Sequence, residues 1–196
     1  MTWRANADMH HAPQGVHDFL RAYYHHKSAD WKGNAPRPLK GRTAEELAKL
    51  PTYYVMDLAR TMAETIAEEM PSADAIAANI WLPERELYFY SAEYTRTGFQ
   101  GGLQWYRCGT SGAFTSEFEI FSGRTVNVPS CFISGRQDLG TYQRPGVFEA
   151  MQATACTRVL GVHLIDGACH WVQRTACRGE VAIAGVSARD RKPLNI

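Results

Sequence analysis

Apolar side chains recur at helical spacing through the first two thirds of the chain. Within residues 17–31, the apolar positions that share one helical face are Phe19, Leu20, Tyr23 and Tyr24. The same spacing predicts further helices over residues 52–70, 84–97 and 103–107, and Gly98 is expected to end the second of these. This part of the chain is therefore expected to be helical.

The pattern changes in the last third, where two short apolar runs replace the helical spacing. Residues 125–135 and 158–167 are apolar almost throughout rather than alternating, which suits strands that are covered on both faces. Between them, residues 145–157 begin with a proline suited to a first helical turn and continue with apolar residues at helical spacing. Strand, helix and strand predict a βαβ unit with a right-handed crossover. The predicted fold class is therefore α/β.

The composition is that of an ordinary soluble globular protein. The chain has 196 residues, of which 45% are hydrophobic and 21% charged, with a net charge of +1. This balance gives no reason to expect nucleic acid or an anionic membrane as a partner. No apolar run approaches the ~20 residues that a membrane span needs, and residues 1–13 lack the apolar centre of a secretory signal. Five cysteines without a C-x-x-C pair argue against a disulfide framework and predict a cytoplasmic location.

Two polar residues follow the predicted strands and are candidates for a catalytic pair. Asp138 comes just after the first strand, and His170 just after the second. In open α/β sheets, functional groups gather beyond the carboxyl ends of the strands. A carboxylate there can bind one imidazole nitrogen, which leaves the other nitrogen to act as a base. Asp166 is a rival acid, but it is too near His170 in sequence to belong to the neighbouring strand. We therefore interpret it as a turn residue. His163 lies inside a strand and is interpreted as a packed residue.

Two pairs of adjacent histidines raise the question of a metal site. These pairs are His10 with His11, and His25 with His26. Adjacent histidines do not converge on one ion as an i, i+4 pair on a helix does, and no cysteine pair accompanies them. We therefore expect histidines on a solvated surface, no bound metal and no cofactor.

Three motifs in the chain carry a family likeness. They are residues 93–107 (EYTRTGFQGGLQWYR), 128–138 (VPSCFISGRQD) and 167–171 (GACHW). In this order they resemble the end of the cap domain, the strand with the catalytic acid and the catalytic histidine turn of the soluble epoxide hydrolases. The likeness extends over about residues 53–173. It implies a partial α/β-hydrolase fold, in which a helical cap is followed by the last βαβ unit of the parallel sheet.

The resemblance also implies roles for particular residues. Asp138 matches the family's catalytic acid and His170 its base, in the chain order that this fold uses. Tyr106 matches one of two cap tyrosines that bind the epoxide oxygen. The second is Tyr53 in preference to Tyr54, because the segment resembles the helix that bears it, and neighbouring helical residues point about 100° apart. Two phenol O–H donors would stabilise the negative charge that develops on oxygen when an epoxide opens.

The chain departs from the family in what it lacks and in how it ends. The family carries its nucleophilic aspartate upstream of the cap, in a pattern like Gly-x-Asp-x-Gly, and a His-Gly-x-Pro loop also lies upstream. Neither pattern occurs here, and the chain starts about where the cap starts. After Gln173 the sequence differs from the family, with Gly185 interrupting any helix and a charged tail at 189–192. Cys169 replaces the usual glycine, and at a positive φ its Cβ would cost on the order of 1 kcal/mol.

These features predict residues 1–110 as a cap or lid region and residues 111–196 as the C-terminal part of the core. The expected function is that of an epoxide hydrolase-like enzyme acting on a small-molecule epoxide, inactive as an isolated chain because the nucleophile is absent. Open sheet edges predict self-association or association with a complementary N-terminal half. Two alternatives stay open. One is a catalytically inactive fragment or pseudoenzyme that acts as a binding module. The other is a haloalkane dehalogenase-like hydrolase, whose halide site would use the N–H groups of Trp81 and Trp105.

Overall fold

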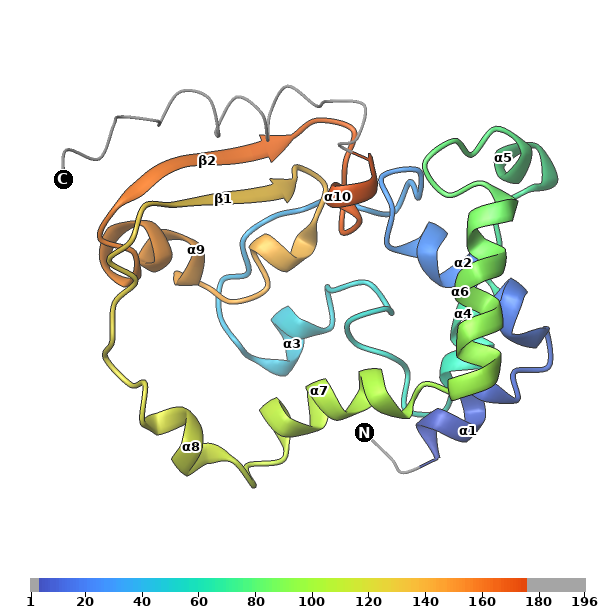
Figure 1. Cartoon of the computed structure of the whole chain (residues 1–196), viewed down its shortest axis with the longest axis horizontal. Coiled ribbons are helices and arrows are strands. Elements are labelled where there is room, and N and C mark those ends of the chain that lie inside the picture. Colours follow the sequence, from blue (N-terminus) through green and yellow to red (C-terminus); the bar gives the residue numbers. More distant parts are fainter. Residues whose placement is uncertain (1–3, 176–196) are drawn as a thin grey trace, which may run out of the picture. The chain divides into compact units, whose positions relative to one another are not determined.

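Figure 1 shows the computed structural model of the chain, in which residues 4–175 are described. These residues divide into two compact units, each with its own internal contacts. The first, the helical unit, comprises residues 4–31 and 43–124. The second, the sheet unit, comprises residues 32–42 and 125–175.

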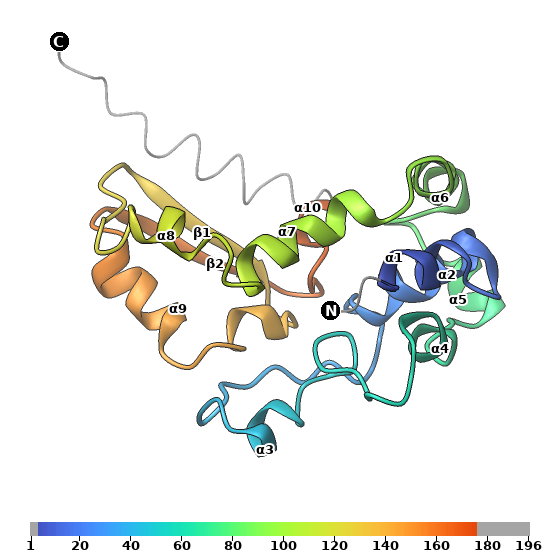
Figure 2. The ribbon, with the colours of Figure 1, turned by 90° about the horizontal axis from the view of Figure 1, so that it is seen from below.

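The helical unit is built around one amphipathic helix, α2 (Gly15–His26). Its helices are α1 (Ala5–His10), α2 (Gly15–His26), α3 (Ala44–Leu47), α4 (Met62–Ala67), α5 (Ala73–Ala77), α6 (Glu84–Thr97), α7 (Gln100–Thr110) and α8 (Thr115–Glu119). Helix α2 packs against α1, α4 and α6, which gather around it in Figure 2. Phe19 of α2, Ile66 of α4 and Leu87 of α6 are all almost completely buried in the shared core. Burial of such side chains contributes about 1.5–3 kcal/mol each and holds the unit together.

Most of the predicted helices are present. The helix expected over 17–31 is α2, which ends earlier, at His26. The helix expected over 84–97 is α6, and Gly98 follows it with a φ of 69°. The helix expected over 103–107 is the centre of the longer α7. The short helices α1, α5 and α8 were not predicted, because segments of five or six residues are too short for a periodic pattern to stand out.

The predicted continuous helix over 52–70 is wrong. Residues 52–54 form turns, and a helix appears only at α4, Met62–Ala67. The side chain of Asp57 accepts a hydrogen bond from the backbone N–H of Ala59, which gives the backbone a local alternative to the helix. A complete capping box between Thr61 and Glu64 then fixes a new helix start. The apolar spacing was correct, but local polar side chains decided where the helix begins.

The sheet unit contains the predicted βαβ arrangement. Its elements are β1 (Ser130–Gly135), the 3-10 turn η1 (Leu139–Thr141), α9 (Val147–Ala150) with the π-helical turn η2 (Met151–Ala155), β2 (Val159–Ile165) and α10 (Val172–Thr175). The two strands lie side by side and parallel, as Figure 1 shows. Their register runs from Ser130 opposite Val159 to Gly135 opposite Ile165. The predicted parallel pairing is therefore confirmed, although β1 begins five residues later than the apolar run suggested.

Three sequence features lie outside the described residues: Cys177, Gly185 and the charged segment 189–192. The assignment of residues 1–110 as a cap and 111–196 as a core region stays a prediction. Between residues 4 and 175, none of the helices has the length and apolar character that crossing a membrane requires.

Candidate active site

The sheet unit brings the side chains of Asp138 and His170 together. His170 Nδ1 lies 3.3 Å from Asp138 Oδ2, at the carboxyl ends of the two parallel strands. Asp138 Oδ1 accepts a second hydrogen bond, from the backbone N–H of Gly140 at 2.8 Å, as the N-cap of η1. The carboxylate is mostly buried, whereas the imidazole is about one third exposed. Both carboxylate oxygens are thus engaged, and the acid is held in one orientation toward the imidazole.

This contact depends on how closely the two turns pack beyond the strands. The N–H of Gln137 donates to the carbonyl of Ala168 at 3.0 Å, and the thiol of Cys169 donates to the carbonyl of Gln137 at 3.1 Å. A Cβ on Gly135 would lie only 2.4 Å from the backbone of Ala168 and Cys169, so the approach requires glycine. The sequence does not reveal this requirement, because nothing in it shows which glycine meets another backbone.

The expected backbone cost of Cys169 does not arise. No non-glycine residue within 4–175 has a positive φ, and the left-handed position of this turn is instead occupied by Gly167, with a φ of 70°. Cys169 is almost fully buried beneath the histidine turn. Its side chain therefore packs the site rather than straining it.

The rival acid Asp166 is directed to another partner. Its carboxylate forms an ion pair with Arg136, and its side chain is exposed. His163 lies opposite Ile133 in the ladder and is partly buried. Asp138 is thus the carboxylate that meets His170, as the sequence predicted.

The two candidate tyrosines belong to the helical unit. Tyr106 lies on α7 and is about half exposed. Tyr53 lies in a turn rather than on a helix, so the helical placement assumed for it is wrong. Tyr53 and Tyr54 are both partly buried, with ring centroids 4.7 Å apart. The choice of Tyr53 over Tyr54 therefore stays a prediction.

The residues that pack around the turn of Tyr53 and Tyr54 were not predicted from the sequence. Lys27 is almost completely buried, with Nζ 5.5 Å from the ring centroid of Tyr53 and 5.3 Å from that of Tyr54. The ring centroid of Tyr23 also lies 5.5 Å from this ammonium; Tyr23 is partly buried, and this desolvation strongly raises the pKa of its phenol. A lysine at the end of an amphipathic helix normally reaches solvent, so no sequence signal pointed to this cluster.

Known proteins are similar to this chain over part of their length. No family model matches. Epoxide hydrolase A of Mycobacterium tuberculosis is 38% identical over 110 residues, which cover 53% of this chain and 30% of that protein. Epoxide hydrolase 3 of Siraitia grosvenorii is 32% identical over 101 residues, covering 48% and 30%. The chain is epoxide hydrolase-like. It spans about a third of the length of these curated relatives, and the match is to their C-terminal part.

Solved structures extend the similarity to most of the described chain. An epoxide hydrolase from an endophytic Streptomyces aligns with a TM-score of 0.63 at 22% identity, covering 91% of this chain and 46% of the other. Epoxide hydrolase A of Mycobacterium thermoresistibile aligns with a TM-score of 0.60 at 25% identity, covering 95% and 48%. The fold of this epoxide hydrolase-like chain is therefore a part of the α/β-hydrolase fold, as the sequence predicted.

The tryptophans that motivated the dehalogenase alternative do not form a halide site within the helical unit. The indole N–H of Trp81 donates to Asp30 at 2.9 Å, and the side chain of Trp105 is largely exposed. An N–H that is already bound to a carboxylate cannot also bind a halide. This observation favours the epoxide hydrolase-like interpretation.

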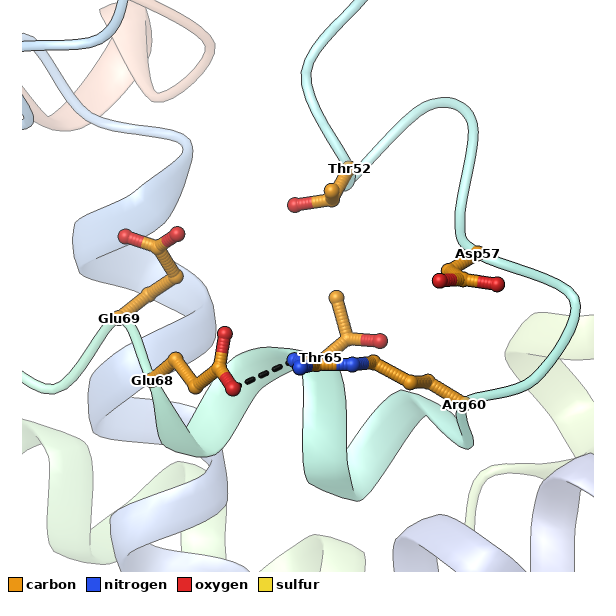
Figure 3. A pocket seen from close by; sticks show the side chains of 6 residues that line it. All are labelled: Thr52, Asp57, Arg60, Thr65, Glu68 and Glu69. Carbon is orange, nitrogen blue, oxygen red and sulfur yellow. Dashed lines mark ion pairs between the residues drawn. The ribbon is translucent and has the colours of Figure 1, made fainter.

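A separate polar pocket of about 230 Å³ lies in the helical unit (Figure 3). It is lined by Thr52, Asp57, Arg60, Thr65, Glu68 and Glu69. Arg60 is paired with Glu68 across it, and Glu69 accepts the indole N–H of Trp31 at 2.7 Å. The charged side chains are thus largely committed to one another, and none of the four predicted site residues lines the pocket.

The histidine pairs lie in the helical unit. His10 and His11 make an edge-on ring contact, and His11 is exposed. His26, by contrast, is fully buried, so the expectation of a surface position is wrong for this residue. In the described part of the chain, no group of three or more potential ligands is arranged to hold a metal ion.

Proposed function

We propose that this chain supplies the acid–base half of an epoxide hydrolase active site, acting on a small-molecule epoxide. The observation that carries the proposal is the 3.3 Å contact between His170 Nδ1 and Asp138 Oδ2. With its proton on Nδ1 held by the carboxylate, the imidazole presents Nε2 as a base of fixed orientation. A contact of this length is typical of an acid–base pair that tightens when substrate is bound.

The proposed reaction has two steps. A carboxylate from the complementary half attacks an epoxide carbon, the ring C–O bond breaks, and the oxygen takes a proton from a phenol donor. A water molecule then gives a proton to Nε2 of His170 and adds to the ester carbonyl. Collapse of this adduct releases the diol and restores the carboxylate, and the proton taken up by His170 returns to the phenolate. Asp138 stabilises the imidazolium that forms in this second step.

Tyr106 and Tyr53 are the proposed phenol donors, on the strength of the family likeness. Tyr106 lies within the residues that resemble the family's Trp-Tyr-Arg motif, on a helix and partly exposed, as a group that meets substrate must be. Replacing Tyr106 with phenylalanine removes only the hydroxyl. We expect the rate of the alkylation step to fall about 10²-fold or more, as for loss of one oxyanion donor. Single-turnover kinetics of the chain in complex with an N-terminal half that supplies the nucleophile would measure this rate.

The nucleophile is proposed to come from a complementary N-terminal half. The chain spans less than half the length of the solved epoxide hydrolases, and its sheet unit has two parallel strands. Parallel sheets are normally covered on both faces, yet Leu160 of β2 is exposed, as are Val126 and Val128 in the segment that leads into β1. These side chains favour association with further strands, in a longer protein or in a separate polypeptide, over an isolated chain. Self-association is the competing outcome of the same exposure.

Complementation tests both the reaction and the role of the pair. The chain is co-expressed with the N-terminal half of Mycobacterium tuberculosis epoxide hydrolase A and assayed with styrene oxide. We expect no hydrolysis by the chain alone and measurable hydrolysis by the complex. His170→Ala is expected to reduce the rate about 10³-fold, because the ester is no longer attacked by activated water. His11→Gln, which alters an exposed histidine, is the matched control and leaves the rate unchanged.

The outcomes separate the candidate functions. Hydrolysis by the chain alone would mean that it holds a nucleophile of its own. A complex that forms without activity would favour a binding module instead of an enzyme. We also propose a cytoplasmic location, because the cysteines within the described residues (Cys108, Cys131, Cys156 and Cys169) form no disulfide, as in a reducing compartment. Cell fractionation with a tagged chain tests it.

A further inference from the structure

A second pair of side chains connects the two turns that carry Asp138 and His170. Arg136 directly follows β1, and Asp166 directly follows β2. The guanidinium Nε of Arg136 donates to Asp166 Oδ1, and its Nη2 donates to the carbonyl of Leu164 at 3.1 Å. One side chain thus binds both the side chain and the backbone of the neighbouring strand end.

Backbone hydrogen bonds also connect the turn after β1 to the turn after β2. The N–H of Arg136 donates to the carbonyl of Ile165 at 2.9 Å, and the N–H of Gln137 donates to that of Ala168 at 3.0 Å. Asp138 is the next residue on the first turn, and His170 lies two residues beyond Ala168 on the second. Any opening between the turns near Arg136 would therefore be transmitted to the acid and the base.

We propose that Arg136 and Asp166 are positioning residues that hold the turn of the acid against the turn of the base. The inference rests on the proposed function, since it assigns a role toward that site. The separation of 3.3 Å between His170 and Asp138 is near the upper limit for a hydrogen bond, so a small displacement of either turn breaks it. Arg136 and Asp166 are exposed, and such pairs contribute little to global stability. Their effect is therefore local, on the distance between the turns.

The test uses the full chain and NMR observation of two groups. The ring nitrogens of His170 report which nitrogen carries the proton, and amide exchange at Gln137 reports opening between the turns. Arg136→Met and Asp166→Asn are each expected to shift the His170 ring signals toward a mixture of tautomers. Exchange at Gln137 is expected to accelerate about 1.4- to 5-fold, the factor that an exposed ion pair of ~0.2–1 kcal/mol supplies.

Two further variants make the result specific. The double variant Arg136→Asp with Asp166→Arg restores the pair in reverse and is expected to restore most of the His170 signature. Arg96→Met removes an equally exposed ion pair, that with Glu93, but within the single helix α6. It is expected to leave both signals unchanged.

The results separate this inference from the proposed function. If the unaltered chain shows no fixed His170 tautomer, the acid–base pair itself fails. If the tautomer is fixed and stays fixed in both Arg136→Met and Asp166→Asn, the positioning role is overturned. Asp166→Asn keeps the bond from Arg136 to Leu164 and is the milder change, so it decides the matter should Arg136→Met prevent folding.

Discussion

Replacing Gly135 with alanine is expected to separate Asp138 from His170. The added Cβ would lie 2.4 Å from the carbonyl carbon and oxygen of Ala168 and from the carbonyl oxygen of Cys169. All three are backbone atoms, so no side chain can rotate away and one of the turns must move. We expect a loss of about 3 kcal/mol in the free energy of unfolding, at the upper end of overpacking effects. Urea denaturation of the chain measures it.

The same change is expected to reduce activity in the complemented enzyme about 10²-fold, because a shift of ~1 Å in a catalytic group has effects of that size. Gly101→Ala is the matched control. Gly101 lies in α7 with nothing within 4 Å of its added Cβ, so alanine there is expected to be neutral or stabilising by up to about 1 kcal/mol. A Gly135→Ala chain that kept both its stability and the fixed tautomer of His170 would show that the two turns do not pack as described.

The contact between Asp138 and His170 could be predicted because it depends on a rule of topology. Two apolar runs separated by a helical segment predicted parallel strands, and the carboxyl ends of adjacent parallel strands lie at the same edge. Asp138 and His170 are the residues that follow these ends, and they do meet. Choosing Asp138 over Asp166 also followed from the sequence, since a residue in the same turn as His170 cannot come from the neighbouring strand.

The interactions that hold Asp138 and His170 in position could not be predicted, because they depend on contacts between particular atoms. No pattern shows that Gly135 faces the backbone of Ala168, or that Arg136 reaches Asp166. The helix expected at Tyr53 failed for a similar reason, since the capping box at Thr61 and Glu64 outweighs the apolar spacing that precedes it. Periodicity indicates which face of a segment is buried, but local hydrogen bonds determine where that segment begins.

The buried histidine His26 is expected to make the chain sensitive to acid. Its side chain is fully buried, and neither ring nitrogen has a hydrogen-bond partner. Burial, and then the nearby His25 and Lys27, lower the pKa of His26 from 6.5 to about 4. Glu69 Oε1 lies 3.8 Å from Nε2, beyond hydrogen-bonding range, and Glu69 Oε2 accepts the indole N–H of Trp31.

The sign of the effect follows from proton binding. Above pH 6.5 His26 is neutral in both the folded and the unfolded chain, and the full stability is present. Between pH 6.5 and about 4 only the unfolded chain binds the proton, so the free energy of unfolding falls by up to 1.4 kcal/mol per pH unit, about 3 kcal/mol in all. Urea denaturation at pH 7.5, 6.0, 5.0 and 4.5 measures this slope.

Comparison with His26→Leu isolates the contribution of this residue. Leucine fills a similar volume without a titrating group, so the variant is expected to lose about 2.5 kcal/mol less than the unaltered chain between pH 7.5 and 4.5. His25, whose pKa burial also lowers, keeps a smaller slope of the same sign in both proteins. His11→Gln changes an exposed histidine and is expected to follow the unaltered chain at every pH. Parallel curves for His26→Leu and the unaltered chain would mean that water or a partner reaches this imidazole in solution, and that the core between α2 and Tyr53 opens there.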